Sequence, residues 1–127
     1  MIPALTELRA AGFRLVTLTN SSKAAVADQI KNAGLTKFFD ALLSVEDVGK
    51  YKPHADVYRW AAGRVGANVS ECLLVAAHGW DVAGAKWAGM RTAFVARPGQ
   101  PKFPLGPAID ISIPSLAELR IELTKME

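Results

Sequence analysis

Thr19 and Asn20 are the first residues whose types suggest chemistry, because they stand between an apolar segment and a helical pattern. A hydroxyl, an amide and the free backbone N–H groups of a helix N-terminus together can bind an anion. A plain helix cap explains the same residues on local sequence alone. This turn is therefore predicted to be either a small anion site or a cap.

Lys52 and Asp81 are the charged residues that could act together with this turn. Lys52 precedes Pro53 in a loop, where it could supply a fixed positive charge for a carboxylate or phosphate. An ordinary surface lysine is the alternative. Asp81 follows the most apolar strand pattern and could pair with Lys52, cap its helix or ligate a cation.

Three further residues have structural explanations beside chemical ones. His78 could titrate near neutrality, although a lone histidine is more often a packed or hydrogen-bonded residue. Trp80 is expected to form a pocket wall or to fill the core. Cys72 is the single cysteine and lies in an apolar run, so we expect an inert buried thiol, with no intramolecular disulfide and no cysteine-based zinc site.

An alternation of helices and strands must position these residues. Helical patterns cover residues 3–11, 23–33, 54–65, 80–89 and 116–123, and strand patterns cover residues 13–18, 41–43, 71–77, 92–96 and 109–113. Residues 97–107 are rich in proline and glycine and are expected to form a loop. The alternation predicts an α/β fold, with a Rossmann-like parallel sheet flanked by helices. Ligands bind at the carboxyl ends of such strands, where the polar turns fall.

Composition limits the function classes. The chain has 127 residues, 50% of them hydrophobic and 21% charged, which predicts one folded domain over residues 1–127. The net charge of +3 comes with no basic run, so no nucleic-acid partner is expected. Because no apolar stretch reaches the length of a membrane span, we expect no membrane association and a cytoplasmic location. Neither a dinucleotide-binding nor a P-loop glycine pattern follows a strand, and no cofactor is expected.

Three segments in this order resemble the haloacid dehalogenase (HAD) superfamily, and most closely the type II L-2-haloacid dehalogenases. They are Leu18-Thr19-Asn20-Ser21-Ser22, then Tyr51-Lys52-Pro53 with Tyr58, then Val75-Ala76-Ala77-His78-Gly79-Trp80-Asp81 with Gly84-Ala85. The resemblance covers nearly the whole chain. It implies a hydrolase in which an aspartate attacks the carbon that bears the halogen, and water then hydrolyses the resulting ester.

The resemblance also implies roles for single residues. Thr19 and Asn20 are similar to residues that hold the substrate carboxylate, Lys52 to the lysine that neutralises the nucleophile, and Asp81 to its acidic partner, which helps to position the hydrolytic water. Three residues match substrate-contacting or pocket-lining positions: Tyr58, His78 and Trp80. Dehalogenases of this type need no metal, so no metal ligand is expected. The implied partner is a small carboxylate or phosphate substrate.

The sequence departs from the family at two places. Some dehalogenases carry Ser-Ser-Asn where this chain has Ala76-Ala77-His78, so substrate contacts are expected to differ. The family's first strand with its nucleophilic aspartate, and its helical cap, should precede Pro3. We therefore expect a C-terminal part of the core domain that is inactive or incomplete as a catalyst alone. The alternatives are a HAD-type small-molecule phosphatase and a catalytically inactive α/β binding module.

The position of that first strand has a structural consequence. In the family it lies between the strands matched by residues 13–18 and 71–77. Without it, either these two strands pair directly, or another chain fills the gap by strand addition or swapping. We expect self-association, as a homo-oligomer.

Overall fold

Helices and strands alternate along the chain in this computed structural model, which describes residues 2–96 and 109–126. The expected loop over residues 97–107 lies outside the described residues. Every predicted helix and strand has a counterpart, although the first and third strands are shorter than predicted. The main elements are α1 (Ile2–Ala10), β1 (Val16–Thr19), α2 (Lys23–Asn32), β2 (Ala41–Ser44), α3 (Ala55–Arg64), β3 (Leu73–Ala76), α4 (Gly79–Trp87), β4 (Arg91–Val95), β5 (Ile111–Ile113) and α5 (Leu119–Met126).

The described strands form two parallel sheets. β1 pairs with β2, with Val16 opposite Ala41. β3 pairs with β4, and β4 with β5. The prediction of parallel sheet flanked by helices is confirmed, but β1 and β3 do not pair with each other. The first of the two options, direct pairing of these strands, is therefore wrong.

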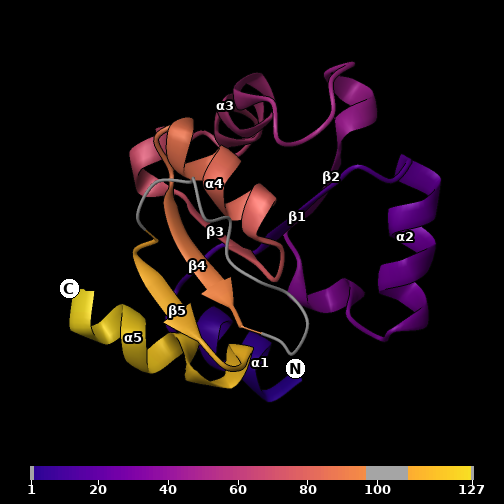
Figure 1. The fold of residues 1–127 in the computed structure, drawn as a ribbon. Helices are drawn as coiled ribbons and strands as arrows, with labels where there is room; N and C mark the ends of the chain where they lie inside the picture. Colours follow the sequence, from indigo (N-terminus) through magenta and orange to yellow (C-terminus); the bar gives the residue numbers. More distant parts are fainter. Residues whose placement is uncertain (1, 97–108, 127) are drawn as a thin grey trace.

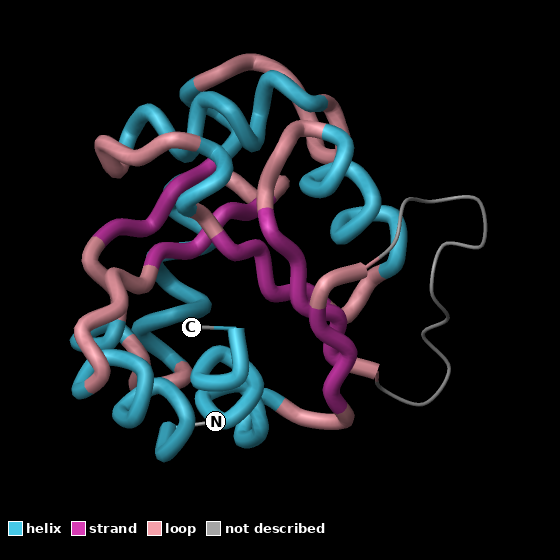
Figure 2. The backbone as a smooth tube through the Cα atoms, turned by 90° about the vertical axis from the view of Figure 1, so that its left-hand side faces the viewer, coloured by secondary structure: helices cyan, strands magenta, loops and turns pink. Residues whose placement is uncertain are grey.

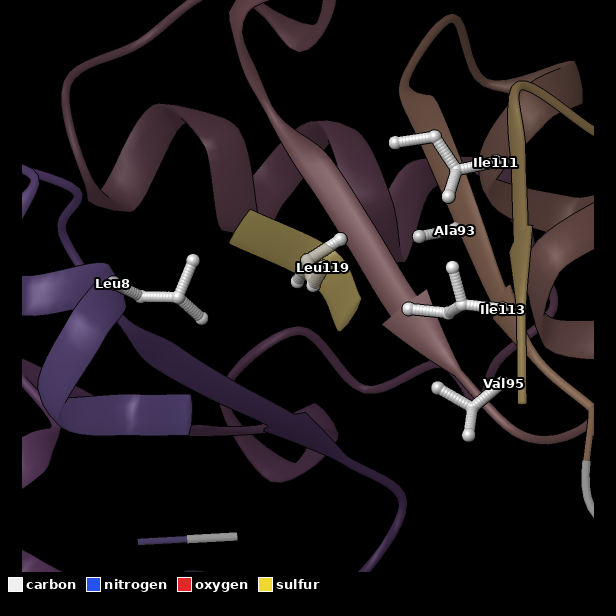
Figure 3. Close-up of a cluster of buried hydrophobic side chains, with 6 residues drawn as sticks. All are labelled: Leu8, Ala93, Val95, Ile111, Ile113 and Leu119. Atoms are coloured by element: carbon white, nitrogen blue, oxygen red, sulfur yellow. The ribbon is translucent and has the colours of Figure 1, made fainter. Parts of the chain in front are cut away.

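Helices cover the three-stranded sheet on both faces. One apolar cluster joins α1 and α5 to β4 and β5, and its members are Leu8, Ala93, Val95, Ile111, Ile113 and Leu119 (Figure 3). A second cluster joins α3 and α4, through Tyr58, Ala62, Ala85 and Ala88. The view in Figure 1 accordingly places α1 and α5 on one side of β3–β5 and α3 and α4 on the other, with α2 beside β2. A quarter turn shows the strands between these helical layers (Figure 2).

Local capping explains where the helices next to the strand ends begin. The Ser22 hydroxyl accepts a hydrogen bond from the Ala25 N–H at 3.0 Å, which confirms a serine cap on α2. The α4 helix begins at Gly79 with His78 as its N-cap residue, slightly earlier than predicted. Among the described helices, none combines the length and the apolar character needed to cross a membrane.

Asp110 fastens β5 to its neighbours. Its carboxylate accepts two hydrogen bonds from the Lys86 ammonium of α4, at 2.9 and 3.0 Å, and one from the Thr92 N–H of β4 at 2.9 Å. Partial burial acts to raise the pKa of Asp110, but Lys86 and the Thr92 N–H outweigh it and hold the pKa below its ordinary value of 3.8.

Asp110→Asn should lower the free energy of unfolding at pH 7 by about 1 kcal/mol, because it removes the charge that Lys86 and Thr92 hold. A lowered folded-state pKa contributes stability that is complete above the unfolded pKa and lost as pH falls through the folded pKa. The difference between variant and wild type should therefore shrink in acid. Denaturant unfolding at neutral and strongly acidic pH measures it. The control is Asp28→Asn, since the exposed Asp28 side chain has no hydrogen bond or ion pair among the described residues. An Asp110→Asn deficit that stayed constant across this range would contradict the prediction.

Candidate active site

Lys52 and Asp81 form a buried ion pair at the carboxyl ends of β1 and β3. The Lys52 Nζ lies 2.7 Å from the Asp81 Oδ2, and the two side chains are 10% and 7% exposed. The same ammonium donates to the Leu18 carbonyl of β1 at 2.9 Å. Lys52 is thus not an ordinary surface lysine, and Asp81 pairs with it rather than only capping a helix.

Tyr58 of α3 fixes the other oxygen of Asp81. Its hydroxyl lies 2.6 Å from the Asp81 Oδ1 and 3.1 Å from the Asp81 carbonyl oxygen. Burial and the adjacent carboxylate raise the pKa of Tyr58 far above its ordinary value, so this hydroxyl stays protonated as a donor. The side chain is fully buried, at 0% exposure, and supports Asp81 from below instead of forming an open pocket wall.

The Thr19–Asn20 turn is joined to the Lys52 loop. The Asn20 Oδ1 accepts a hydrogen bond from the Lys52 N–H at 2.9 Å, across the cleft between their two loops. The Thr19 hydroxyl accepts one from the Ser21 N–H at 3.0 Å. Asn20 is exposed, and its amide nitrogen makes no hydrogen bond within the described part of the chain. This amide can therefore donate to a bound anion.

The first N–H of α2 already has an acceptor within the chain. The Lys23 N–H donates to the Glu46 carboxylate, while Ser22 caps the next turn. Both interpretations of this turn thus hold in part: the helix is capped internally, and the exposed donors are those of Asn20.

His78 and Trp80 lie at the first turn of α4, on either side of Gly79. Both are exposed, and their ring centroids are 5.7 Å apart with the planes tilted by 31°. Trp80 is 40% exposed, so it does not fill the core. Neither side chain has a described hydrogen bond to Lys52 or Asp81. The structure thus joins five of the seven predicted residues by hydrogen bonds, namely Thr19, Asn20, Lys52, Tyr58 and Asp81, with Thr19 joined through the Ser21 N–H of the same turn.

An open pocket of about 370 Å³ adjoins this network at Asn20. Its lining includes Asn20, Glu46, Lys50 and Tyr51, but neither Lys52 nor Asp81. No group of three or more His, Cys, Asp or Glu side chains is placed to hold a metal ion within residues 2–96 and 109–126.

Ser44 is a supporting residue that the sequence reasoning missed. It ends β2 and is fully buried. Its hydroxyl donates to the Ser21 carbonyl at 2.6 Å and accepts from the Glu46 N–H at 3.1 Å, which holds the turn after β1 against the loop after β2. Its sequence signal is weak: a hydroxyl residue at a strand's carboxyl end, as Thr19 is.

Gly84 is a second missed residue, and it sets how closely α4 approaches the Lys52 loop. A Cβ at this position would lie 2.6 Å from the Pro53 Cβ, 2.9 Å from the Pro53 carbonyl oxygen and 3.0 Å from the Tyr58 hydroxyl. The Lys52–Pro53 peptide bond is cis. Only a glycine lets α4 carry Asp81 this close to both of its partners.

Comparisons with known proteins agree with this geometry. A family model described as a haloacid dehalogenase-like hydrolase matches residues 1–89. An (S)-2-haloacid dehalogenase from Pseudomonas sp. (strain YL) is 35% identical over 113 residues, which are 89% of this chain and 49% of that protein. The chain spans about half the length of the curated relatives it matches.

Solved structures are similar over nearly the whole chain. An L-2-haloacid dehalogenase from Xanthobacter autotrophicus, with chloropropionic acid covalently bound, superposes with a TM-score of 0.92 at 29% identity, over 98% of this chain and 60% of that one. A HAD phosphatase from Thermococcus onnurineus superposes with a TM-score of 0.84 at 31% identity, over 96% of this chain and 55% of that one.

Gly84→Ala should destabilise the fold by about 1–3 kcal/mol, because the new methyl group overlaps Pro53 and Tyr58. Gly63→Ala is the matched control, since a Cβ at Gly63 on α3 meets no atom within 4 Å. That change should stabilise the helix by about 0.5 kcal/mol. Denaturant unfolding of the two variants measures both effects. Equal stability changes in the two variants would show that Gly84 does not set the approach of α4.

Proposed function

The chain belongs to the haloacid dehalogenase-like hydrolase family, and from this premise we propose that it forms the lysine- and aspartate-bearing part of a dehalogenase. The proposed reaction is the hydrolytic removal of halide from small (S)-2-haloacids. The substrate class rests on the names of the relatives and on the chemistry of the residues around Lys52.

The observation that carries this proposal is the arrangement of donors around Lys52. An ammonium group has three N–H donors. Two of them are used, by the Leu18 carbonyl and by Asp81. The third is available to a further acceptor at the carboxyl end of β1. A buried cation whose charge Asp81 balances can hold a second carboxylate ionised and oriented without leaving excess charge in the site.

In the proposed reaction a carboxylate attacks C2 of the haloacid, the new C–O bond forms as the carbon–halogen bond breaks, and halide leaves with the bonding electron pair. Water then attacks the carbonyl carbon of the ester, which releases the 2-hydroxy acid, regenerates the carboxylate and frees one proton. The proposal assigns the attack to a carboxylate other than Asp81. Both oxygens of Asp81 are already engaged, one by Tyr58 and one by Lys52.

Asn20 and Thr19 are assigned to the substrate carboxylate. Asn20 presents a free amide beside the α2 N-terminus, where the partial positive charge of the helix favours an anion. The internal acceptor Glu46 limits how far an anion can reach toward α2. Only a small acid therefore suits this position. His78 is assigned to the edge of the site, where it replaces an amide with an imidazole.

A phosphatase that acts on a small phosphate ester is the second candidate. The observation that favours it is the superposition with the HAD phosphatase from Thermococcus onnurineus, at a TM-score of 0.84. Lys52 and the Asn20 amide could hold a phosphate as well as a carboxylate, so direct binding must decide between the two.

Asn20→Asp should weaken binding of (S)-2-chloropropionate at least tenfold. The new side chain keeps the Oδ1 that accepts from the Lys52 N–H, but it replaces the free amide donor with negative charge. Titration of the 127-residue chain, followed by the NMR signals of residues 19–22, measures the affinity. Asn32→Asp, an exposed position at the opposite end of α2, makes the same charge change as a control and should leave the affinity unchanged.

Three outcomes of this titration would count against the proposal. Equal weakening by Asn32→Asp would show a general charge effect in place of a site at Asn20. Tighter binding of inorganic phosphate with Mg²⁺ than of (S)-2-chloropropionate would favour the phosphatase. Binding of neither ligand would favour a catalytically inactive module.

A further inference from the structure

The facing edges of β1 and β3 point their unpaired backbone groups at each other. The Leu15 carbonyl accepts from the Asp40 N–H on the β2 side, and the Cys72 carbonyl accepts from the Arg91 N–H on the β4 side. In parallel strands, successive residues direct their backbone groups to opposite sides. The backbone groups of Val16 and Leu18 in β1, and of Leu73 and Val75 in β3, therefore face the space between the two sheets.

One of these groups confirms the direction. The Leu18 carbonyl is bonded to the Lys52 ammonium, which also holds Asp81 beyond the end of β3. Lys52 thus closes the carboxyl end of the space between β1 and β3. Since the two strands belong to separate sheets, no strand ladder fills the rest of it within the described residues.

We infer that this space is a docking site for an extended, uncharged, apolar polypeptide segment, which adds between β1 and β3 as a parallel strand. Strand addition of this kind gives affinity through main-chain hydrogen bonds to both open edges. The inference is independent of the reaction proposed for Lys52 and Asp81. The segment called for must be at least four residues long, because β1 and β3 each have four.

Burial along the strands supports this inference. Interior strands of parallel sheets are usually covered on both faces. Here all four residues of β1 are only half-buried, and Val75 of β3 is 37% exposed. By contrast Ile111 and Ile113, on β5 at the outer edge of the sheet, are 5% and 3% exposed. The most apolar strand of the sequence is thus less covered than a short strand at the sheet's outer edge.

The chemistry of the walls specifies the segment. Neither β1 (Val-Thr-Leu-Thr) nor β3 (Leu-Leu-Val-Ala) carries a charged residue or a proline, the usual protections of an exposed sheet edge. Leu18 packs against the α3–α4 cluster, and Leu73 against the α1–α5 cluster. Helical layers therefore lie over both faces of the space, so the inserted strand must be apolar on both of its faces.

The comparison with a larger protein agrees with an open space. The Xanthobacter autotrophicus dehalogenase superposes on 98% of this chain with a TM-score of 0.92, although the chain covers only 60% of that protein. β1 and β3 are thus set apart as in a protein that contains further polypeptide. They have not moved together to pair.

A synthetic peptide tests the docking site on the 127-residue chain. The probe has the core Val-Ile-Val-Val, preceded by two lysines for solubility, with both ends blocked. We expect saturable binding, with slower hydrogen exchange at residues 16–18 and 73–75. A peptide with proline in place of the isoleucine should not bind, because proline lacks the N–H and breaks a strand interior.

A pair of variants tests which edge the peptide meets. Val75→Pro removes one N–H that faces the space and leaves the backbone groups that pair with β4 in place, so peptide affinity should fall at least tenfold. Val75→Thr keeps the N–H and the branched side chain and should bind like wild type. The proline control peptide is read on the unmodified chain, so the test survives if Val75→Pro fails to fold.

Two results would overturn the inference. Slow exchange of both edges in the free chain, at a mass of about twice 13.6 kDa, would mean that a second copy fills the space. Unchanged exchange at both edges with saturating peptide would mean that the space does not accept a strand at all.

Discussion

The Lys52–Asp81 ion pair connects parts of the molecule that no strand pairing joins. Lys52 reaches the Leu18 carbonyl in the two-stranded sheet and Asp81 beside the three-stranded sheet, with both charged groups nearly fully buried. A buried pair gives little net stability compared with apolar packing, yet losing one partner typically costs about 3–5 kcal/mol. The pair therefore does little to hold the fold, but the fold must accommodate it, and the residues around it are chosen to do so.

Those surrounding residues form a chain of dependent contacts. Tyr58 orients Asp81 from α3, Asn20 holds the Lys52 backbone, and Ser44 holds the turn that carries Asn20. Gly84 permits α4 to approach closely enough for the first of these contacts. Each residue satisfies a polar atom of another one, so the geometry is fixed from several elements at once. Such multiple fixation is what a preorganised electrostatic site requires.

The order of elements and the edge at which polar residues meet could be predicted from the sequence, because both follow from periodicity and from parallel topology. Thr19, Asn20 and Asp81 each follow a strand pattern directly, and they meet as expected. The burial of Tyr58 could not be predicted, since its cover comes from α4, a distant segment. The same holds for Gly84, whose neighbours at Pro53 and Tyr58 are near neither in sequence nor in helical register. Trp80 was expected to line a pocket or fill the core and is 40% exposed, because the α4 helix begins at Gly79 and turns this side chain outward.

The separation of the two sheets and the position of Lys52 depend on each other. Neighbouring strands lie about 5 Å apart. If β1 and β3 paired directly, the Leu18 carbonyl would bond to β3, and Lys52 would lose one of its two acceptors. With one strand between them they stand about 10 Å apart, which leaves the strand ends open to a side chain that bridges them. The observed bonds of Lys52 to Leu18 and Asp81 fit the wider spacing. The same spacing that leaves two edges unpaired thus also gives the ammonium its place between them.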